Sequence, residues 1–346
     1  MRKIIIVMIA LLFCTVSASA LEYTAPDAPE SAQPYMKEDP ESFSDGLLYI
    51  IKSAISELRP SLAEAGRVCL TLIAIMLLAS IIKNFSSTSK QIVDLVTALC
   101  VATTLIQSSN SMIHLGAQTV GQISDYGKLL LPVMTASLAA QGGTTTSAAL
   151  YTGTAFFNTI LSSAITKLIV PMVYVNMALC IGYSAIGEEI LKNIRNFSKW
   201  LITWSLKTIL YVFTGYLSIT GVVSGTTDAA VLKAAKLTVS GVVPVVGKIV
   251  SDASETILVS ACVIKNTVGV YGLLAIAAVW IGPFIQIGTQ YLLLKLTCTI
   301  CATFGQKETV GLIKDFSELM GILVAMTSCM CILLLVSVIC YLKGVG

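Results

Sequence analysis

The feature that most constrains this chain is a series of apolar runs, several of them about as long as a bilayer is thick. The last run, from Gly321 to Leu342, contains no charged residue. A helix needs about 20 mostly apolar residues to cross ~30 Å of hydrocarbon. Because lipid offers no hydrogen bonds to the backbone, a spanning segment must pair its own polar groups, which favours helices. The runs therefore predict an all-α, polytopic integral membrane protein.

The composition supports this prediction. Of the 346 residues, 55% are hydrophobic and 12% are charged, and the mean hydropathy is +0.85. An average soluble domain is about one quarter charged, so this chain has too few charges to cover a water-facing surface. The net charge is +3, and no basic run is dense enough to indicate nucleic acid. We expect the lipid bilayer, and not nucleic acid, as a partner.

The N-terminus has the pattern of a secretory signal. Arg2 and Lys3 precede an apolar stretch from Ile4 to Val16, and small residues follow up to Ala20. A positive start, a short apolar core and a small-residue site predict a signal peptide over residues 1–20, cleaved after Ala20. The alternative is an uncleaved anchor helix, for which the apolar core is short.

The segment behind the signal is acidic. Between Glu22 and Glu64 there are nine acidic and three basic residues, a net charge of −6. Basic residues are retained in the cytoplasm, whereas acidic ones are little bar to export. We therefore predict that residues 21–43 form a flexible acidic exported leader, and that residues 44–346 form a helical membrane domain.

The membrane domain is expected to contain about 7–9 transmembrane or re-entrant helices plus amphipathic interfacial helices. A helix from Ser44, ended or kinked at Pro60, has one apolar face and is predicted to lie on the outer surface. A mixed polar stretch over residues 107–128 is read as a connection, and the run at 129–140 is too short to cross alone. The predicted spans are 68–82, 92–106, 148–168, 168–186, 201–223, 268–287, 291–303 and 321–342.

The distribution of basic residues predicts the orientation. Lys192, Arg195 and Lys199 form the densest positive cluster of the chain, and the positive-inside rule assigns them to the cytoplasm. Counting the predicted spans from there places residues 224–267 outside and Lys343 inside.

A polar, glycine-rich segment over residues 139–151, "AAQGGTTTSAALY", lies between two apolar runs. Glycines allow a sharp reversal, hydroxyl side chains can cap the next helix, and a proline removes a helical hydrogen bond. This glycine-rich segment predicts a discontinuous or re-entrant helix pair, of the kind with which transporters point the start of a helix at a substrate. The alternative is a plain polar turn at the membrane face. The candidate residues are Pro132, Gly142, Gly143, Thr144, Thr145, Thr146 and Ser147.

A second run, "SGTTDAAVL", resembles this glycine-rich segment, because it also has Gly-Thr-Thr ahead of small residues. It indicates either a trace of an internal repeat or two independent helix caps with the same chemistry. The candidate residues of this second motif are Gly225, Thr226, Thr227 and Asp228, with Pro244 and Gly247 further on.

Few groups in the chain could do chemistry. Lys207 lies seven residues into an apolar run, which makes it a candidate for a buried charge that lines a cavity; the alternative is a side chain that snorkels. The single histidine, His114, has no cysteine or carboxylate at metal-ligand spacing, and no nucleophile or phosphate-binding motif is present. We expect a protein that is not an enzyme and has no cofactor or metal.

Two blocks carry a resemblance to a known family. "LLLPVMTASLAAQGGTTTSAAL" and "SGTTDAAVLKAAKLTVSGVVPVVGKIVSDASET" resemble stage III sporulation protein AE of endospore-forming bacteria. The resemblance extends from about Leu47 to the C-terminus. It implies a multi-pass protein of the mother-cell membrane around the forespore, acting as a pore or platform subunit of a channel-like, secretion-like complex.

The resemblance also implies partners. These are the secretion-type ATPase AA, other membrane proteins of the same operon, the ring-forming proteins AG and AH, and the forespore protein Q. Two other functions remain open from the residues: a stand-alone secondary transporter with its substrate site near residues 141–147, and a pure assembly scaffold.

Overall fold

The computed structural model of the chain describes residues 25–37, 42–85, 90–242, 246–305 and 307–343, with the side chains of 90–91, 221–262 and 264–265 excepted. The predicted signal peptide lies outside these residues. No strand occurs in the described part of the chain, and the prediction of an all-α protein is confirmed. The elements are η1 (Glu30–Tyr35), α2 (Phe43–Phe85), α3 (Lys90–Ala140), α4 (Thr144–Ala164), η2 (Ile165–Ile169), α5 (Val170–Ile186), α6 (Glu189–Val242), α7 (Val246–Cys301) and α8 (Lys307–Lys343).

Five segments among the described residues are long and apolar enough to cross a membrane. They are Phe43–Phe85, Ile92–Ala140, Thr144–Ile186, Asn266–Cys301 and Lys307–Lys343. Helix α6 is not among the five, although residues 201–223 were predicted to span; its side chains are described only up to Thr220. The length and hydropathy of the five segments support a polytopic membrane protein.

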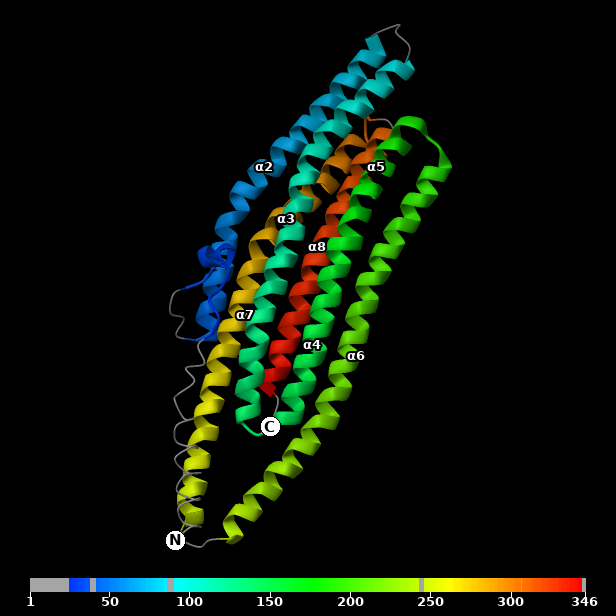
Figure 1. Ribbon diagram of the computed structural model, residues 1–346. Coiled ribbons are helices and arrows are strands. Elements are labelled where there is room, and N and C mark those ends of the chain that lie inside the picture. Colours follow the sequence, from blue (N-terminus) through cyan, green and yellow to red (C-terminus); the bar gives the residue numbers. More distant parts are fainter. Residues whose placement is uncertain (1–24, 38–41, 86–89, 243–245, 306, 344–346) are drawn as a thin grey trace.

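The helices are much longer than a bilayer requires. Helix α3 has 51 residues, which corresponds to about 76 Å at 1.5 Å per residue. The long helices run side by side in alternating directions, so that α2, α5 and α7 all end at one end of the bundle (Figure 1). At the opposite end, the turn from α3 to α4 lies beside the end of α8 (Figure 1).

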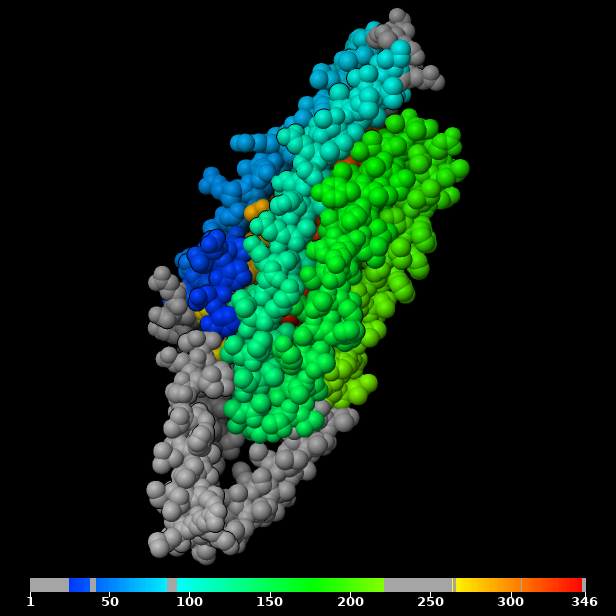
Figure 2. All heavy atoms as spheres, in the orientation of Figure 1, coloured from blue at the N-terminus to red at the C-terminus, as the bar shows by residue number. Residues whose placement is uncertain are grey.

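Helix α8 occupies the centre of the bundle. It packs against α3, α4, α5, α6 and α7, and in the space-filling view only small patches of its red atoms show between α3 and the green helices (Figure 2). Its sequence is apolar nearly all round over residues 321–342, which is the pattern of a buried helix rather than a surface one. The charge-free run over residues 321–342 is therefore buried at the centre of the bundle.

One close approach of two helices depends on a glycine. Tyr216 of α6 lies directly over Gly153 of α4, where the Cβ of any larger residue would overlap the tyrosine ring. The Tyr216 hydroxyl donates a hydrogen bond of 2.8 Å to the carbonyl oxygen of Ala149. Close helix contact at a small residue, with a polar anchor, is typical of membrane bundles.

Several predicted spans merge into single helices, which corrects the predicted boundaries. Residues 148–168 and 168–186 form α4 and α5, joined without a break by the π-helical segment η2. Pro171 follows this segment; since proline lacks the N–H and crowds the preceding turn, a local widening there has a physical cause. Residues 268–287 and 291–303 likewise belong largely to the single helix α7, which passes through Thr289 and Gln290.

Two further boundaries differ from the prediction. The mixed stretch over 107–128 is helical and belongs to α3, where Ser109, Thr119 and Ser124 are buried. Helix α2 also continues through Pro60 rather than ending there.

The position of the C-terminal end is another correction. Because α7 is one helix, α8 begins at the end of the bundle where α5 ends. The hydroxyl groups of Tyr341 and Thr135 lie 2.9 Å apart, which fixes the end of α8 beside the end of α3. Lys343 therefore lies at the end opposite Lys192, whereas the count of predicted spans placed both on one side.

The acidic leader is also more ordered than predicted where it is described. Residues Glu30–Tyr35 form the short helix η1, which packs on α7 and α2. Ala32 is fully buried, and the Ser31 hydroxyl donates a hydrogen bond of 2.9 Å to Gln122 Oε1 of α3. This part of the segment predicted to be flexible is thus docked on the bundle.

Candidate functional site

The glycine-rich segment forms the tight turn between α3 and α4. Gly142 has φ +92°, a left-handed conformation that glycine adopts without steric cost. The backbone N–H of Gly142 donates to Ala139 O at 2.9 Å, and that of Gly143 donates to Leu138 O at 3.2 Å. The predicted reversal is therefore present, and Gly142 is the residue that requires glycine.

The helices on both sides of this turn are long, which differs from a pair of short half-helices. Residues 129–140 are the last part of α3, and Pro132 lies within that helix on an exposed face. Helix α4 begins at Thr144 with Gly143 as its N-cap, so no threonine occupies the cap position. The Ser147 hydroxyl donates instead to the carbonyl oxygen of Thr144 at 3.0 Å. The structure thus gives a hairpin of long helices, and Thr145 and Thr146 lie in the first turn of α4.

The second motif does not begin a helix. Gly225, Thr226, Thr227 and Asp228 lie inside α6, which runs unbroken from Glu189 to Val242, so the prediction of a helix cap there is wrong. Gly247 lies in the first turn of α7. Pro244 lies outside the described residues, as do the side chains of the whole motif.

Lys207 lies outside the groove and the ion-pair site described below. It lies on the exposed face of α6. Its position agrees with the alternative of a side chain that reaches outward along an apolar surface.

A polar groove of about 560 Å³ lies between α2, α3 and α7. In Figure 2, orange atoms of α7 are visible between the blue α2 and the cyan α3. We call this hollow the α2–α3–α7 groove. Its lining residues are Ser61, Glu64, Ala65, Arg67, Val68, Thr71, Thr103, Thr104, Gln107, Ser108, Ser111, Met112, Gln286 and Gln290.

The groove is polar although it lies between helices that are apolar enough to span. Gln290 is 4% exposed, and its Nε2 donates to Ser108 Oγ at 3.0 Å. The hydroxyls of Thr71 and Thr104 bond carbonyl oxygens four residues earlier in their own helices. Polar side chains at membrane depth are tolerated where they face protein or water. The groove therefore gathers polar side chains of three helices on a surface that would face protein or water rather than lipid.

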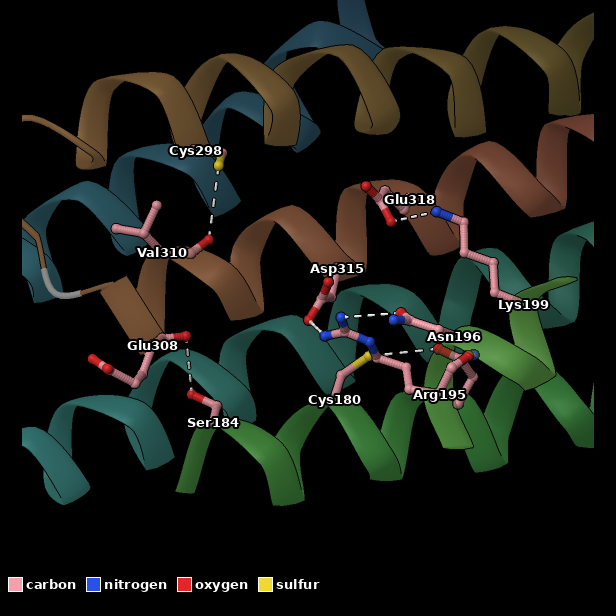
Figure 3. Close-up of polar contacts among 11 residues, drawn as sticks. Cys180, Ser184, Arg195, Asn196, Lys199, Cys298, Glu308, Val310, Asp315 and Glu318 are labelled. Atoms are coloured by element: carbon pink, nitrogen blue, oxygen red, sulfur yellow. Dashed lines mark hydrogen bonds and ion pairs between the residues drawn. The ribbon is translucent and has the colours of Figure 1, made fainter. Parts of the chain in front are cut away.

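A second polar site joins α6 to α8 near the end where α5 stops (Figure 3). Arg195 forms an ion pair with Asp315, and Lys199 forms one with Glu318. The Arg195 and Asp315 side chains are 15% and 12% exposed, whereas those of Lys199 and Glu318 are 41% and 38% exposed. The first pair is therefore largely desolvated and the second is not.

Helix α5 completes this second site. Asn176 Nδ2 donates to the carbonyl oxygen of Arg195 at 3.1 Å, and the Arg195 guanidinium lies 5.4 Å from the ring centre of Tyr183, within cation–π range. At the solvent-exposed edge of this site, the carboxylate of Glu189 accepts hydrogen bonds from Lys192 and raises the pKa of that lysine. Cys180 of α5 also lies in this site, where its thiol donates to Asn176 Oδ1 at 3.5 Å. The contacts hold three helices together.

Sequence reasoning missed the acidic half of this site. Asp315 and Glu318 lie in "QKETVGLIKDFSELM", which reads as an amphipathic connector. A signal was present, because the acids are spaced by three and the bases Arg195 and Lys199 by four, so each pair lies on one helix face. Within the described residues, no three His, Cys, Asp or Glu side chains are grouped so that they could hold a metal ion.

Long antiparallel helices, an exposed surface rich in leucine, isoleucine and aromatic residues, and polar groups gathered between helices define a helical, multi-pass membrane protein. A sequence profile described as stage III sporulation protein AE matches residues 32–344. The chain therefore belongs to the stage III sporulation protein AE family.

The stage III sporulation protein AE of Bacillus subtilis (strain 168) is 22% identical over 200 residues, which cover 58% of this chain and 50% of the relative. The chain thus spans about half the length of that relative. No solved structure matches the chain.

Proposed function

We propose that this chain is a non-enzymatic membrane subunit, pore or platform, of a channel-like complex that links mother cell and forespore during sporulation. The family match over residues 32–344 carries the proposal. The apolar bundle supports it, because a protein of this kind works within a membrane and must obtain energy from a partner. The proposed partners are the ATPase AA, the ring-forming proteins AG and AH, the forespore protein Q and other membrane proteins of the same operon.

The proposed orientation places the ion-pair end of the bundle in the cytoplasm. Lys192 and Lys199 lie there, beside the exposed and stacked rings of Phe197, Trp200 and Trp204. Basic residues on the cytoplasmic side and aromatic side chains at the membrane boundary are the two usual markers of this interface. The mother-cell membrane is the proposed location, with the N-terminus exported after signal cleavage.

Co-purification tests the proposal. The tagged chain is expressed in sporulating cells of an endospore-forming host, extracted in mild detergent and analysed by mass spectrometry; an unrelated multi-pass protein with the same tag is the control. The proposal predicts that the ATPase AA and the ring-forming proteins are recovered with this chain and not with the control. Recovery of this chain alone, from cells in which the partners are present, would contradict it.

A stand-alone transporter is the second candidate, and the α2–α3–α7 groove is the observation that favours it, since a scaffold needs no such hollow. The purified chain in liposomes distinguishes the two. A transporter moves solute by itself, whereas the proposed subunit leaves solute entry at the level of empty liposomes.

A further inference from the structure

The α2–α3–α7 groove has an unsatisfied polar group in its wall. Ser61 is 6% exposed, and its Oγ has no hydrogen-bond partner among the described residues. A serine in a helix usually bonds the carbonyl oxygen one turn earlier, as the threonines at 71 and 103 do. An unpartnered buried hydroxyl costs about 1–3 kcal/mol. The hydroxyl oxygen is itself shielded from solvent, so the Ser61 side chain must rotate before a group in the groove can bond it and remove that cost.

The groove also has two charges of opposite sign. Glu64 and Arg67 line it from one helical turn of α2, and neither forms an ion pair within the residues that the structure describes. Residues three apart on a helix face the same side, so a carboxylate and a guanidinium flank one opening. Two such groups left apart from each other are complementary to a ligand with both charges.

The far side of the groove can recognise a polar side chain. Gln286 and Gln290 come from α7 and Ser108 from α3. The Gln290 Nε2 group is held by Ser108, and the amide oxygen of a glutamine is an acceptor with two lone pairs. A hydroxyl or amide from the ligand would match both the glutamines and Ser61.

We propose that the α2–α3–α7 groove binds a small polar α-amino acid as its zwitterion. Arg67 binds the α-carboxylate, Glu64 binds the α-ammonium group, and the side chain of the ligand lies toward Ser61 and Gln290. A volume of about 560 Å³ accommodates such a molecule with water. This site lies away from the α3–α4 turn, and the proposal goes beyond the proposed function because it concerns the chain alone.

Threonine and valine provide the sharpest test, since they have nearly the same shape and differ by a hydroxyl in place of a methyl group. Binding of each is measured by isothermal titration to the purified full chain in lipid nanodiscs. The proposal predicts saturable threonine binding and valine binding weaker by about threefold to tenfold, the worth of one hydrogen bond. Two threonine analogues test the charges: 1-amino-2-propanol lacks the carboxylate and N-acetylthreonine lacks the ammonium group, and each is expected to bind at least about tenfold more weakly.

Variants of α2 assign the contacts. Arg67→Gln and Glu64→Gln are each expected to weaken threonine binding about tenfold, the worth of a charge-assisted hydrogen bond. Ser61→Ala should weaken threonine while leaving valine unchanged. Arg59→Gln and Glu57→Gln remove the same charges from α2 outside the groove and should bind threonine as the wild type does. Thermal unfolding without ligand confirms that each variant is folded.

Two results would overturn the proposal. One is the absence of saturable binding of threonine, serine, asparagine or glutamine into the tens of millimolar, which leaves water or a partner's side chains as the occupant of the groove. The other is threonine binding that is the same in folded Arg67→Gln and Glu64→Gln variants as in the wild type. Neither result bears on the co-purification of the chain with its proposed partners.

Discussion

At the scale of single residues, backbone conformation explains why the α3–α4 turn contains glycine. Gly142 has φ +92°, whereas Gly143 has φ −83°. An L-residue in the left-handed region brings its Cβ close to the following carbonyl oxygen. Gly142 and Gly143 look equivalent in the sequence, but the backbone conformation requires glycine only at position 142.

Replacement of Gly142 tests this difference. Gly142→Ala is expected to lower the free energy of unfolding by about 1–2 kcal/mol, the cost of a left-handed alanine. Gly121→Ala is the control, because Gly121 lies inside α3 with open space around a Cβ, and alanine there should stabilise the helix by about 0.5–1 kcal/mol. Denaturant unfolding in detergent measures both, and equal effects of the same sign would contradict the account.

Burial distinguishes the two ion pairs between α6 and α8. The Arg195–Asp315 pair is much less exposed than the Lys199–Glu318 pair. Removal of one partner of a buried pair leaves an uncompensated charge, at a cost of about 3–5 kcal/mol. An exposed pair contributes about 0–1 kcal/mol.

Matched variants test this contrast. Arg195→Met should destabilise the fold by at least about 2 kcal/mol more than Lys199→Met. Addition of Asp315→Asn to Arg195→Met should recover part of the loss, because the orphaned carboxylate is then removed. Equal stability of the two single variants would contradict the claim that burial sets the energetic cost of losing each ion pair.

At the scale of the elements, the sequence predicts helices well and their ends poorly. Within the described residues the predicted apolar spans are helical, because apolar residues in lipid leave the backbone little other pairing. The boundaries fail where polar residues are buried between helices: Ser109, Thr119 and Thr289 read as signs of a loop, yet they lie inside α3 and α7. Thr119 shows how this is possible, since its hydroxyl donates to the Leu115 carbonyl oxygen of its own helix at 2.7 Å.

The functional candidates follow the same rule. The turn at Gly142 is predictable because its signal is local. The ion pairs and the groove are not, because their residues come from helices far apart in the chain, and only the packing brings Arg195 to Asp315 or Gln290 to Ser108. Lys207 is the converse case, since its apolar neighbours suggest burial and the fold turns it outward.

The contact between α4 and α6 gives a prediction at this scale. Gly153→Ala should force Tyr216 out of its place and destabilise the fold by about 1–3 kcal/mol, as overpacking does. Tyr216→Phe keeps the ring but loses its hydrogen bond to Ala149, and should cost about 1 kcal/mol. In a Tyr216→Ala background the Gly153→Ala substitution should be nearly neutral. Thermal unfolding of the wild type, Gly153→Ala, Tyr216→Ala and the double variant completes this cycle, and additive effects would show that the two residues do not touch.

At the scale of the whole molecule, helix length is the main property. Several helices exceed the ~30 Å of hydrocarbon by a factor of about two, so the bundle extends beyond the bilayer. The ends are also unlike: one has the basic cluster and the stacked aromatic rings, and the other has the α3–α4 turn and the end of α8. The proposed subunit, with different partners on the two sides of a membrane, would use such a difference.

The sidedness of three cysteines tests the central claim, that the chain is an antiparallel membrane bundle with its charged cluster and its C-terminal end on opposite faces. Lys192→Cys, Thr144→Cys and Lys343→Cys are made singly in a cysteine-free background and labelled in intact cells with an impermeant maleimide, with permeabilised cells as the control. The account predicts that Cys at 144 and at 343 react from outside and that Cys at 192 reacts only after permeabilisation. Labelling of positions 192 and 343 from the same side would contradict it.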